Sequence, residues 1–204
     1  MIAIIDYEIG NTLSVKNAID KLGYECEITN EQSKINKSKK IILPGVGSFE
    51  KGISNLKKYN LIQILNEEVL VNKKKNLGIC LGFQLMCKSS EEFGHFEGLG
   101  WLDLKVTKIN SKGLRLPHVG WNKIKINKSE TKFLSNMTDN QMLYFNHSYA
   151  VKENISEKFS DLITCEYGEN FIAAIKCGNI FGIQPHPEKS QKQGLQIIKN
   201  FIED

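Results

Sequence analysis

The feature that most constrains the fold is a short apolar segment that runs into a cysteine flanked by glycines and then into a helical pattern. Asn76 to Cys80 reads as a buried strand, and Gly78 and Gly82 surround Cys80 before a helix expected to reach about Ser90. Small residues on both sides let the backbone turn sharply from strand to helix. Such an elbow sits at the carboxyl edge of a sheet, so we expect Cys80 to be presented there and not packed in the core.

The surroundings of this turn favour a reactive thiol. The Leu81 amide and the amino end of the following helix supply partial positive charge, which stabilises a thiolate and any oxyanion formed beside it. The other cysteines lack such a setting, and we interpret them as small buried apolar side chains; they are Cys26, Cys87, Cys165 and Cys177.

Composition indicates one soluble globular domain over residues 1–204, because 41% of its 204 residues are apolar and 25% are charged. The apolar start, Met1–Asp6, lacks a basic lead and is predicted to be a buried strand, not a signal peptide. No apolar run approaches the roughly 20 residues of a membrane helix. Five cysteines without a Cys-x-x-Cys pair argue against a disulfide framework and a zinc site, so we expect a cytoplasmic protein without metal or cofactor.

The net charge of +4 comes from scattered lysines. Arg115 is the single arginine, and no aromatic residues interleave the lysine runs, so nucleic-acid binding is not expected. The chain also lacks a Gly-x-Gly-x-x-Gly or Walker motif. If its pathway handles a phosphorylated substrate, another chain is expected to hold it.

Strands and helices alternate in the first half of the chain, which predicts a parallel sheet with helices on both faces. The strands expected there are Ile2–Asp6, Tyr24–Thr29, Lys40–Leu43 and Asn76–Cys80. The expected helices are one with a helical pattern from Leu13 to Leu22 and a cap at Gly23, then Phe49–Lys58, Leu61–Val71 and the elbow helix.

After Gly98 the chain changes to short, often alternating segments separated by turn residues, which we interpret as antiparallel additions to the same sheet. The segments are Leu102–Ile109, Asn122–Ile126, Met142–Phe145, Leu162–Tyr167, Phe171–Lys176 and Ile180–Gln184, followed by a helix from about Gln191 to Ile202. The predicted class is α/β, with a mostly parallel central sheet flanked by helices and antiparallel additions in the carboxyl-terminal half.

A thiol nucleophile needs an imidazole, and the chain has four histidines. His186 and Glu188 follow the last predicted strand two residues apart, so in an extended backbone both side chains would project to one side. Pro185 and Pro187 restrict the backbone around His186. We therefore interpret His186 as the base and Glu188 as the group that orients it.

Tetrahedral intermediates of acyl transfer also need amide donors. Gly45, Val46 and Gly47 follow Pro44 at the end of a predicted strand, where glycines leave the backbone amides unobstructed. Together with Leu81 they are predicted to form an oxyanion hole.

These motifs resemble the class I, or triad, glutamine amidotransferases. The shared elements are Leu43–Gly47, Gly78–Leu85 and His186-Pro187-Glu188. Further segments are similar to the HisH-type glutaminase subunits of imidazole glycerol phosphate synthase, and they are Asp6–Asn11, Pro117–Asn122, Tyr144–Tyr149 and Glu188–Gln191. The likeness spans nearly the whole chain.

The resemblance implies that Cys80 attacks glutamine and forms a glutamyl thioester, while His186 moves protons and Glu188 orients His186. It assigns glutamine binding to Gln84, Glu92, Ser148 and Tyr149. Ammonia would pass to a HisF-type (β/α)₈ cyclase in a heterodimer, which forms imidazole glycerol phosphate and AICAR in histidine biosynthesis. It also implies that the Pro44–Gly47 segment turns an amide toward the oxyanion when the partner binds.

The chain departs from the family pattern at Glu8, where glycine is usual, at Asn146, where an apolar residue is usual, and at Pro185, where an aromatic is expected. These differences leave open a paralogous glutaminase that supplies ammonia for amidination of a bacterial surface sugar. A catalytically silent interaction subunit is a third reading, which the intact Cys80, His186 and Glu188 disfavour.

Overall fold

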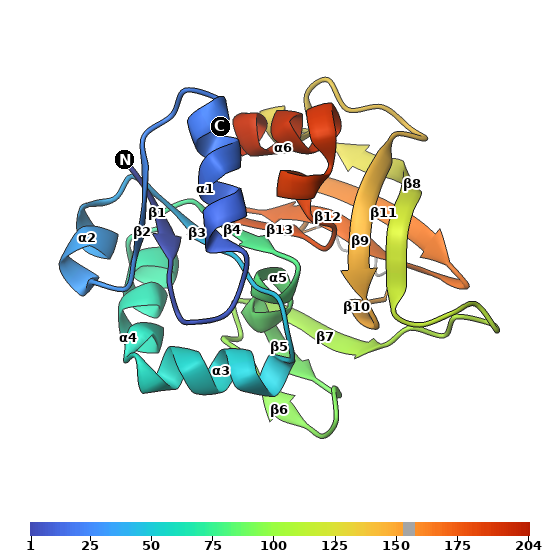
Figure 1. The fold of residues 1–204 in the computed structure, drawn as a ribbon, viewed down its shortest axis with the longest axis horizontal. Helices are drawn as coiled ribbons and strands as arrows, with labels where there is room; N and C mark the ends of the chain where they lie inside the picture. The colour runs from blue at the N-terminus through green and yellow to red at the C-terminus, as the bar shows by residue number, and fades with distance from the viewer. Residues whose placement is uncertain (153–157) are drawn as a thin grey trace.

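The amino-terminal half alternates between strands and helices, as its sequence predicts (Figure 1). The computed structural model describes residues 1–152 and 158–204. The elements up to the elbow are β1 (Ile2–Ile5), α1 (Thr12–Lys21), β2 (Cys26–Thr29), α2 (Gln32–Lys37), β3 (Lys40–Leu43), α3 (Phe49–Lys58), α4 (Leu61–Asn66), a π-helical turn (Glu67–Val71), β4 (Asn76–Ile79) and α5 (Leu81–Met86).

The rest of the chain is mainly strands. They are β5 (Cys87–Ser90), β6 (Phe96–Glu97), β7 (Leu102–Lys108), β8 (His118–Ser129), β9 (Met142–His147), β10 (Tyr149–Val151), β11 (Asp161–Tyr167), β12 (Glu169–Cys177) and β13 (Ile180–Ile183). Short 3₁₀ turns cover Lys132–Leu134 and Pro187–Lys189, and α6 (Gln191–Glu203) closes the fold.

The larger sheet has nine strands in the order β2-β1-β3-β4-β13-β12-β11-β8-β9. The first five run parallel, and each pair from β13 to β9 is antiparallel. This single-domain α/β arrangement confirms the predicted class. Strand β13 returns from the end of the chain to lie beside β4, which brings the His186 segment next to the elbow.

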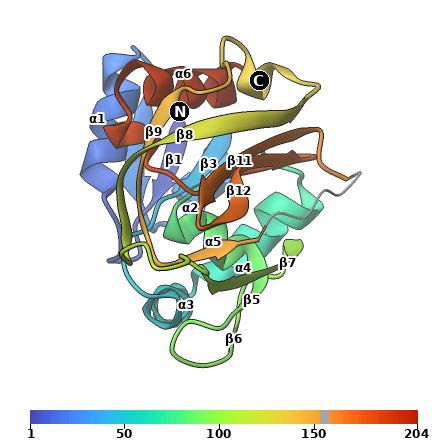
Figure 2. The same ribbon diagram turned by 90° about the vertical axis from the view of Figure 1, so that its right-hand side faces the viewer.

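Helices cover both faces of the parallel strands. Ile2 and Ile4 belong to a core that also contains α1 and α6 side chains, whereas Ala3 and Ile5 belong to a second core with α3, α4 and α5 side chains. This split follows from the alternation of side chains along a strand. Figure 1 shows α1 and α6 above the strands and α3 and α4 below them, and Figure 2 shows the same layers from the side.

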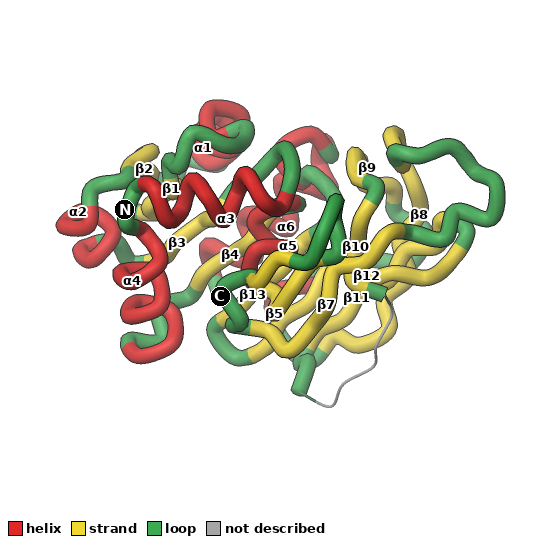
Figure 3. Tube along the Cα trace, turned by 90° about the horizontal axis from the view of Figure 1, so that it is seen from below, coloured by secondary structure: helices red, strands yellow, loops and turns green. Residues whose placement is uncertain are grey.

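The prediction that all carboxyl-terminal strands extend one sheet was wrong. A second sheet has the order β10-β7-β5-β6, and Figure 3 shows β5 and β7 side by side. The elbow helix also ends earlier than predicted, at Met86, because Cys87–Ser90 pairs with β7 instead of continuing the helix. Serine side chains compete with the helical backbone for hydrogen bonds, so ending the helix at this point costs little free energy.

Two helix predictions also need correction. Leu13 is 63% exposed, so the buried face of α1 consists of Val15, Ala18 and Ile19. The predicted helix over Leu61–Val71 is regular only to Asn66 and then widens into the π-helical turn. Local patterns identify the helical stretch, but packing decides which face is covered.

Candidate active site

Cys80 sits at a sharp turn between β4 and α5, with φ of 52° and ψ of −108°. The flanking glycines are required by space. A Cβ on Gly78 would lie 2.7 Å from the backbone of Phe83, and one on Gly82 would lie 1.8 Å from the Leu43 carbonyl oxygen. A non-glycine residue held at positive φ between two such glycines is the strained geometry of a nucleophile elbow.

The structure corrects one expectation about Cys80, which is only 6% exposed. It lies against a small cavity of about 50 Å³, room for a few water molecules. The residues that line this cavity are Val46, Gly47, Cys80, Leu81, Gln84, Glu92, Asn146, His147, Ser148 and Tyr149. The thiol therefore faces a small pocket and not open solvent. Residues at the junction of β9 and β10 line this pocket, and these two strands belong to different sheets.

His186 reaches Cys80 because β4 and β13 are neighbouring parallel strands, with Ile79 opposite Ile183. The segments that follow β4 and β13 both leave the sheet at its carboxyl edge. The Cys80 amide also donates to the Ile183 carbonyl at 2.8 Å. The pairing of β4 with β13 thus brings together two residues that are far apart in the sequence.

Glu188 contacts His186 at 2.8 Å, from Oε1 to Nδ1, and their side chains are 1% and 2% exposed. The predicted extended backbone was wrong here. Pro187–Lys189 forms a 3₁₀ turn, and the Lys189 amide donates to the His186 carbonyl at 3.1 Å. The turn folds Glu188 back onto the imidazole, so the pair forms by a different route from the one predicted.

The electrostatics favour a charged imidazole in this position. Burial lowers the pKa of His186, but the hydrogen bond and charge of Cys80, together with those of Glu188, outweigh burial and raise the pKa to about 10. The site therefore favours the imidazolium form of His186. The second Glu188 oxygen, Oε2, is buried and has no partner among the described residues.

Amides suited to an oxyanion lie beside the same cavity. Those of Val46, Gly47 and Leu81 donate to no backbone acceptor within the described residues. Gly47 has φ of +124°. Gly45, also predicted for this role, does not line the cavity but is wedged against Leu81, Gly82 and Tyr7.

All four residues predicted to bind glutamine line the cavity. Gln84 Nε2 donates to the Tyr149 carbonyl at 2.8 Å and to Gln184 Oε1 at 3.0 Å. Glu92 Oε2 accepts from the Phe49 amide at 2.6 Å, and burial raises the pKa of this carboxyl. Glu92 is the one acidic side chain among the cavity-lining residues, which suits it to an ammonium group.

Sequence reasoning missed three residues near the thiol. Gln184 Nε2 lies 3.6 Å from Cys80 Sγ, and the Asn146 carbonyl lies 4.0 Å from it, while His147 lines the cavity. Gln184 could have been found, because it follows β13 directly and stands two residues before His186. Asn146 and His147 belong to the Tyr144–Tyr149 segment that carries the family resemblance, but their place beside the thiol follows from the pairing of β9 with β8.

The structure separates the histidines by environment. His118 Nδ1 and His147 Nε2 are 3.3 Å apart, and His147 Nδ1 contacts the Tyr149 carbonyl at 2.9 Å. Burial lowers the pKa of His118 to about 4 and that of His147 to about 3, so both are neutral near pH 7. His95 is exposed beside Glu97. His186 is the histidine with a raised pKa and a contact with the thiol.

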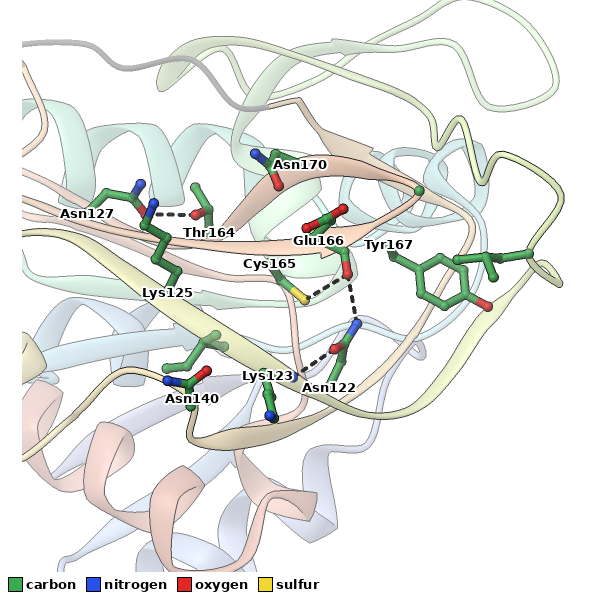
Figure 4. A pocket seen from close by; sticks show the side chains of 13 residues that line it. Asn122, Lys123, Lys125, Asn127, Asn140, Thr164, Cys165, Glu166, Tyr167 and Asn170 are labelled. Carbon is green, nitrogen blue, oxygen red and sulfur yellow. Dashed lines mark hydrogen bonds between the residues drawn. The ribbon is translucent and has the colours of Figure 1, made fainter.

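A larger cavity, of about 570 Å³, lies away from this chemistry on β8, β11 and β12 (Figure 4). It contains none of the predicted site residues. Cys165 lines it, but burial raises the pKa of this thiol to about 12, which makes it a poor nucleophile. Geometry and electrostatics therefore favour the smaller Cys80 cavity as the reaction site.

Within residues 1–152 and 158–204 there is no cluster of three or more His, Cys, Asp or Glu residues suited to a metal ion. No helix in these ranges has the length and apolar character needed to cross a bilayer.

Comparison with solved structures agrees with the fold. A glutamine amidotransferase crystal structure superposes with a TM-score of 0.77 at 15% identity, covering 100% of this chain and 98% of that one. The PurLQS structure from Thermotoga maritima gives 0.77 at 18% identity, covering 99% and 97%. At such identities the likeness concerns the fold alone.

The family model named glutamine amidotransferase class-I matches residues 3–204. The chain belongs to this family and is an enzyme with glutaminase activity. Its relatives include imidazole glycerol phosphate synthase subunit HisH 2 of Methanococcus maripaludis, 46% identical over 99% of this chain and 98% of that protein. Proteins of the same name from Vibrio vulnificus and Pseudomonas aeruginosa are 44% and 39% identical, covering 99% and 100% of this chain and 94% and 99% of theirs.

Proposed function

We propose that residues 1–204 act as one domain, the glutaminase subunit of a cytoplasmic imidazole glycerol phosphate synthase, and that its partner is a HisF-type (β/α)₈ cyclase. Glutamine is hydrolysed to glutamate and ammonia here, and the partner uses the ammonia to form imidazole glycerol phosphate and AICAR. The observation that carries this proposal is the buried His186–Glu188 pair at 2.8 Å beside the elbow thiol.

In the proposed reaction the Cys80 thiolate attacks the side-chain amide carbon of glutamine. The carbonyl oxygen becomes an oxyanion near the amides of Leu81 and Gly47, and the His186 imidazolium gives its proton to the departing ammonia. The neutral imidazole then takes a proton from water as the water attacks the glutamyl thioester. Glu188 keeps Nδ1 protonated and stabilises the imidazolium in each step.

Enclosure of the cavity supports a role for the partner in activation. The cavity beside Cys80 is small, and Val46 and Gly47 form part of its wall, so movement of this segment would change the space open to glutamine. The carbonyl of Tyr144, on β9, accepts from the His186 amide at 2.8 Å. A partner bound to the exposed face of β9 would therefore act on the strand that holds the base.

The test is synthase activity of the complex with a HisF-type partner, supplied with either glutamine or ammonium ions. Cys80→Ala should abolish the glutamine-dependent reaction and leave the ammonia-dependent one intact. Cys87→Ala, which removes a buried thiol outside the cavity, is the matched control. Glutamine-dependent synthesis that survives in Cys80→Ala would contradict the proposed mechanism.

The sugar-directed paralogue differs in the acceptor of ammonia, not in this site. Three of the relatives carry the number 2 in their printed names. Growth of a histidine auxotroph that lacks its own glutaminase subunit distinguishes the two. Failure to restore growth alongside a cognate HisF-type cyclase would favour the sugar pathway.

A further inference from the structure

Tyr7 lies directly after β1, fully buried, and its hydroxyl donates to the Pro44 carbonyl. β1 and β3 are neighbouring parallel strands, so Tyr7 and Pro44 both leave the sheet at the edge that carries Cys80. The main chain of Tyr7 is held as well, because buried Asn55 of α3 donates from Nδ2 to its carbonyl at 2.8 Å.

This contact fixes the peptide between Pro44 and Gly45. A Cβ on Gly45 would lie 2.8 Å from the Tyr7 hydroxyl, 2.8 Å from Leu81 Cβ and 2.8 Å from the Gly82 amide nitrogen. On the neighbouring loop, a Cβ on Gly10 would lie 3.2 Å from Gly45 Cα. Gly45 is therefore clamped between the Tyr7 loop and the nucleophile elbow.

The next two residues are held much less tightly. Val46 is 42% exposed, and nothing lies within 4 Å of a Cβ built on Gly47. The packing thus changes at Gly45, from close contacts at Gly45 to open space around Val46 and Gly47. These two residues line the Cys80 cavity.

We propose that Tyr7 is a positioning residue that aims the Val46 and Gly47 amides at the oxyanion by holding the Pro44–Gly45 peptide, an inference that rests on the proposed glutaminase function. When the Pro44–Gly45 peptide is fixed, rotation of the backbone after Gly45 moves the Val46 and Gly47 amides only a short distance beside Cys80. Without it, the amides are spread over more orientations and are less preorganised. The phenol remains a donor, because burial and then the charge of Cys80 raise its pKa far above the ordinary value.

The test is steady-state glutamine hydrolysis by Tyr7→Phe in complex with the barrel partner. An oxyanion donor acts mainly in the transition state, so we expect kcat to fall about tenfold while KM changes less than about twofold. Alkylation of Cys80 by iodoacetamide passes through no oxyanion and should keep its rate. Tyr24→Phe, which removes a hydroxyl bonded to Glu203 far from the site, is the matched control and should leave all three values unchanged.

An unchanged kcat in Tyr7→Phe would overturn the inference. So would an equal fall in alkylation, which would mean that Tyr7 acts on the thiol, or a rise in KM alone, which would mean that it acts on substrate binding. If Tyr7→Phe does not fold, Asn55→Ala frees the Tyr7 carbonyl, and it must show the same split between kcat and alkylation. A wild-type complex that does not turn over glutamine would overturn the proposed function as well, whereas the variant ratios concern Tyr7 alone.

Discussion

Cys80, His186 and Glu188 contribute differently to the proposed transition states. Cys80 supplies the covalent bond, His186 carries a proton in both half-reactions, and Glu188 contacts only the far side of the imidazole. Because Glu188 Oε1 contacts His186 and Oε2 has no partner within residues 1–152 and 158–204, an amide at this position could keep the same hydrogen bond.

We therefore expect His186→Ala to reduce glutamine hydrolysis by the complex on the order of 10³-fold or more, and Glu188→Gln to reduce it less. The second change removes the negative charge that stabilises the imidazolium but keeps the shape of the side chain. Glutamine turnover by the three triad variants gives the order, and ammonia-dependent synthesis is the internal control. Equal losses in His186→Ala and Glu188→Gln would mean that Glu188 does more than orient the base.

The buried pair of His118 and His147 makes a prediction about stability and pH. Burial holds both pKa values below the ordinary value of 6.5. The unfolded chain therefore binds more protons than the folded one below about pH 6.5, and the stability present above that pH is lost as pH falls toward about 4 and 3. Each histidine contributes at most about 1.4 kcal/mol per pH unit.

Urea unfolding at pH 7 and pH 5 measures this loss. Wild type should lose stability over this interval, and His118→Phe, which keeps an aromatic ring beside Phe145 and Tyr167, should lose less. His95→Gln removes an exposed histidine and should lose as much as wild type. A pH dependence that is unchanged in His118→Phe would refute the assignment of a neutral, buried imidazole.

At the scale of elements, the elbow depends on how closely α5 approaches the end of β3. The Gly82 backbone leaves no room for a side chain next to the Leu43 carbonyl, since a Cβ would lie at 1.8 Å. One methyl group would push the helix away from the strand and displace Cys80.

Gly82→Ala should therefore destabilise the fold by about 3 kcal/mol or more, in line with severe overpacking. Gly178→Ala is the control, because Gly178 has φ of +59° with nothing within 4 Å, so the cost should be near 1 kcal/mol of backbone strain. Chemical denaturation of both variants measures the difference. Similar costs would show that the elbow relaxes more readily than this geometry implies.

At the scale of the molecule, one apolar surface adjoins the active site. Val119, Trp121 and Met142 are exposed on the same face of β8 and β9, where Trp121 lies opposite Tyr144. Asn146, which lies opposite Val119, lines the Cys80 cavity. A partner bound here would cover both the apolar face and the route to the thiol.

Val119→Asp should weaken the complex with the barrel partner by at least tenfold and lower partner-stimulated glutamine turnover in proportion. A charge buried in an interface without a counter-charge is costly. Val71→Asp offers a matched control, because Val71 is 73% exposed and outside this surface. Titration calorimetry on both variants is the measurement, and equal affinities would place the partner elsewhere.

We also expect the isolated chain to hydrolyse glutamine poorly. Val46 and Gly47 form part of the wall of the small cavity beside Cys80, and the family resemblance implies that this segment turns an amide toward the oxyanion when the partner binds. Turnover without partner should be lower by about tenfold or more than turnover with it. Comparable rates would show that the cavity opens without help.

The local Gly-x-Cys-x-Gly pattern was enough to predict the elbow, and Gly78 is demanded by the nearby backbone of Gly82 and Phe83. Gly82 is demanded by the Leu43 carbonyl on a different strand, which is a tertiary contact. Local sequence also determined most strands of the parallel sheet, since their buried faces require continuous apolar runs. His186 and Glu188 are in contact, although the backbone between them is a 3₁₀ turn and not a strand. Features that depend on residue type and on short spacing along the chain can therefore be predicted from the sequence.

Only the tertiary structure decided the enclosure of the thiol, the second sheet and the positions of Tyr7, Asn146 and His147 around the site. Tyr7 meets Pro44 across 37 residues, and Cys80 meets Asn146 across 66. Such contacts depend on which strands become neighbours, and strand order follows from how the whole chain buries its apolar surface. A local sequence pattern does not specify strand order, so the residues that line the site could be identified only from the complete fold.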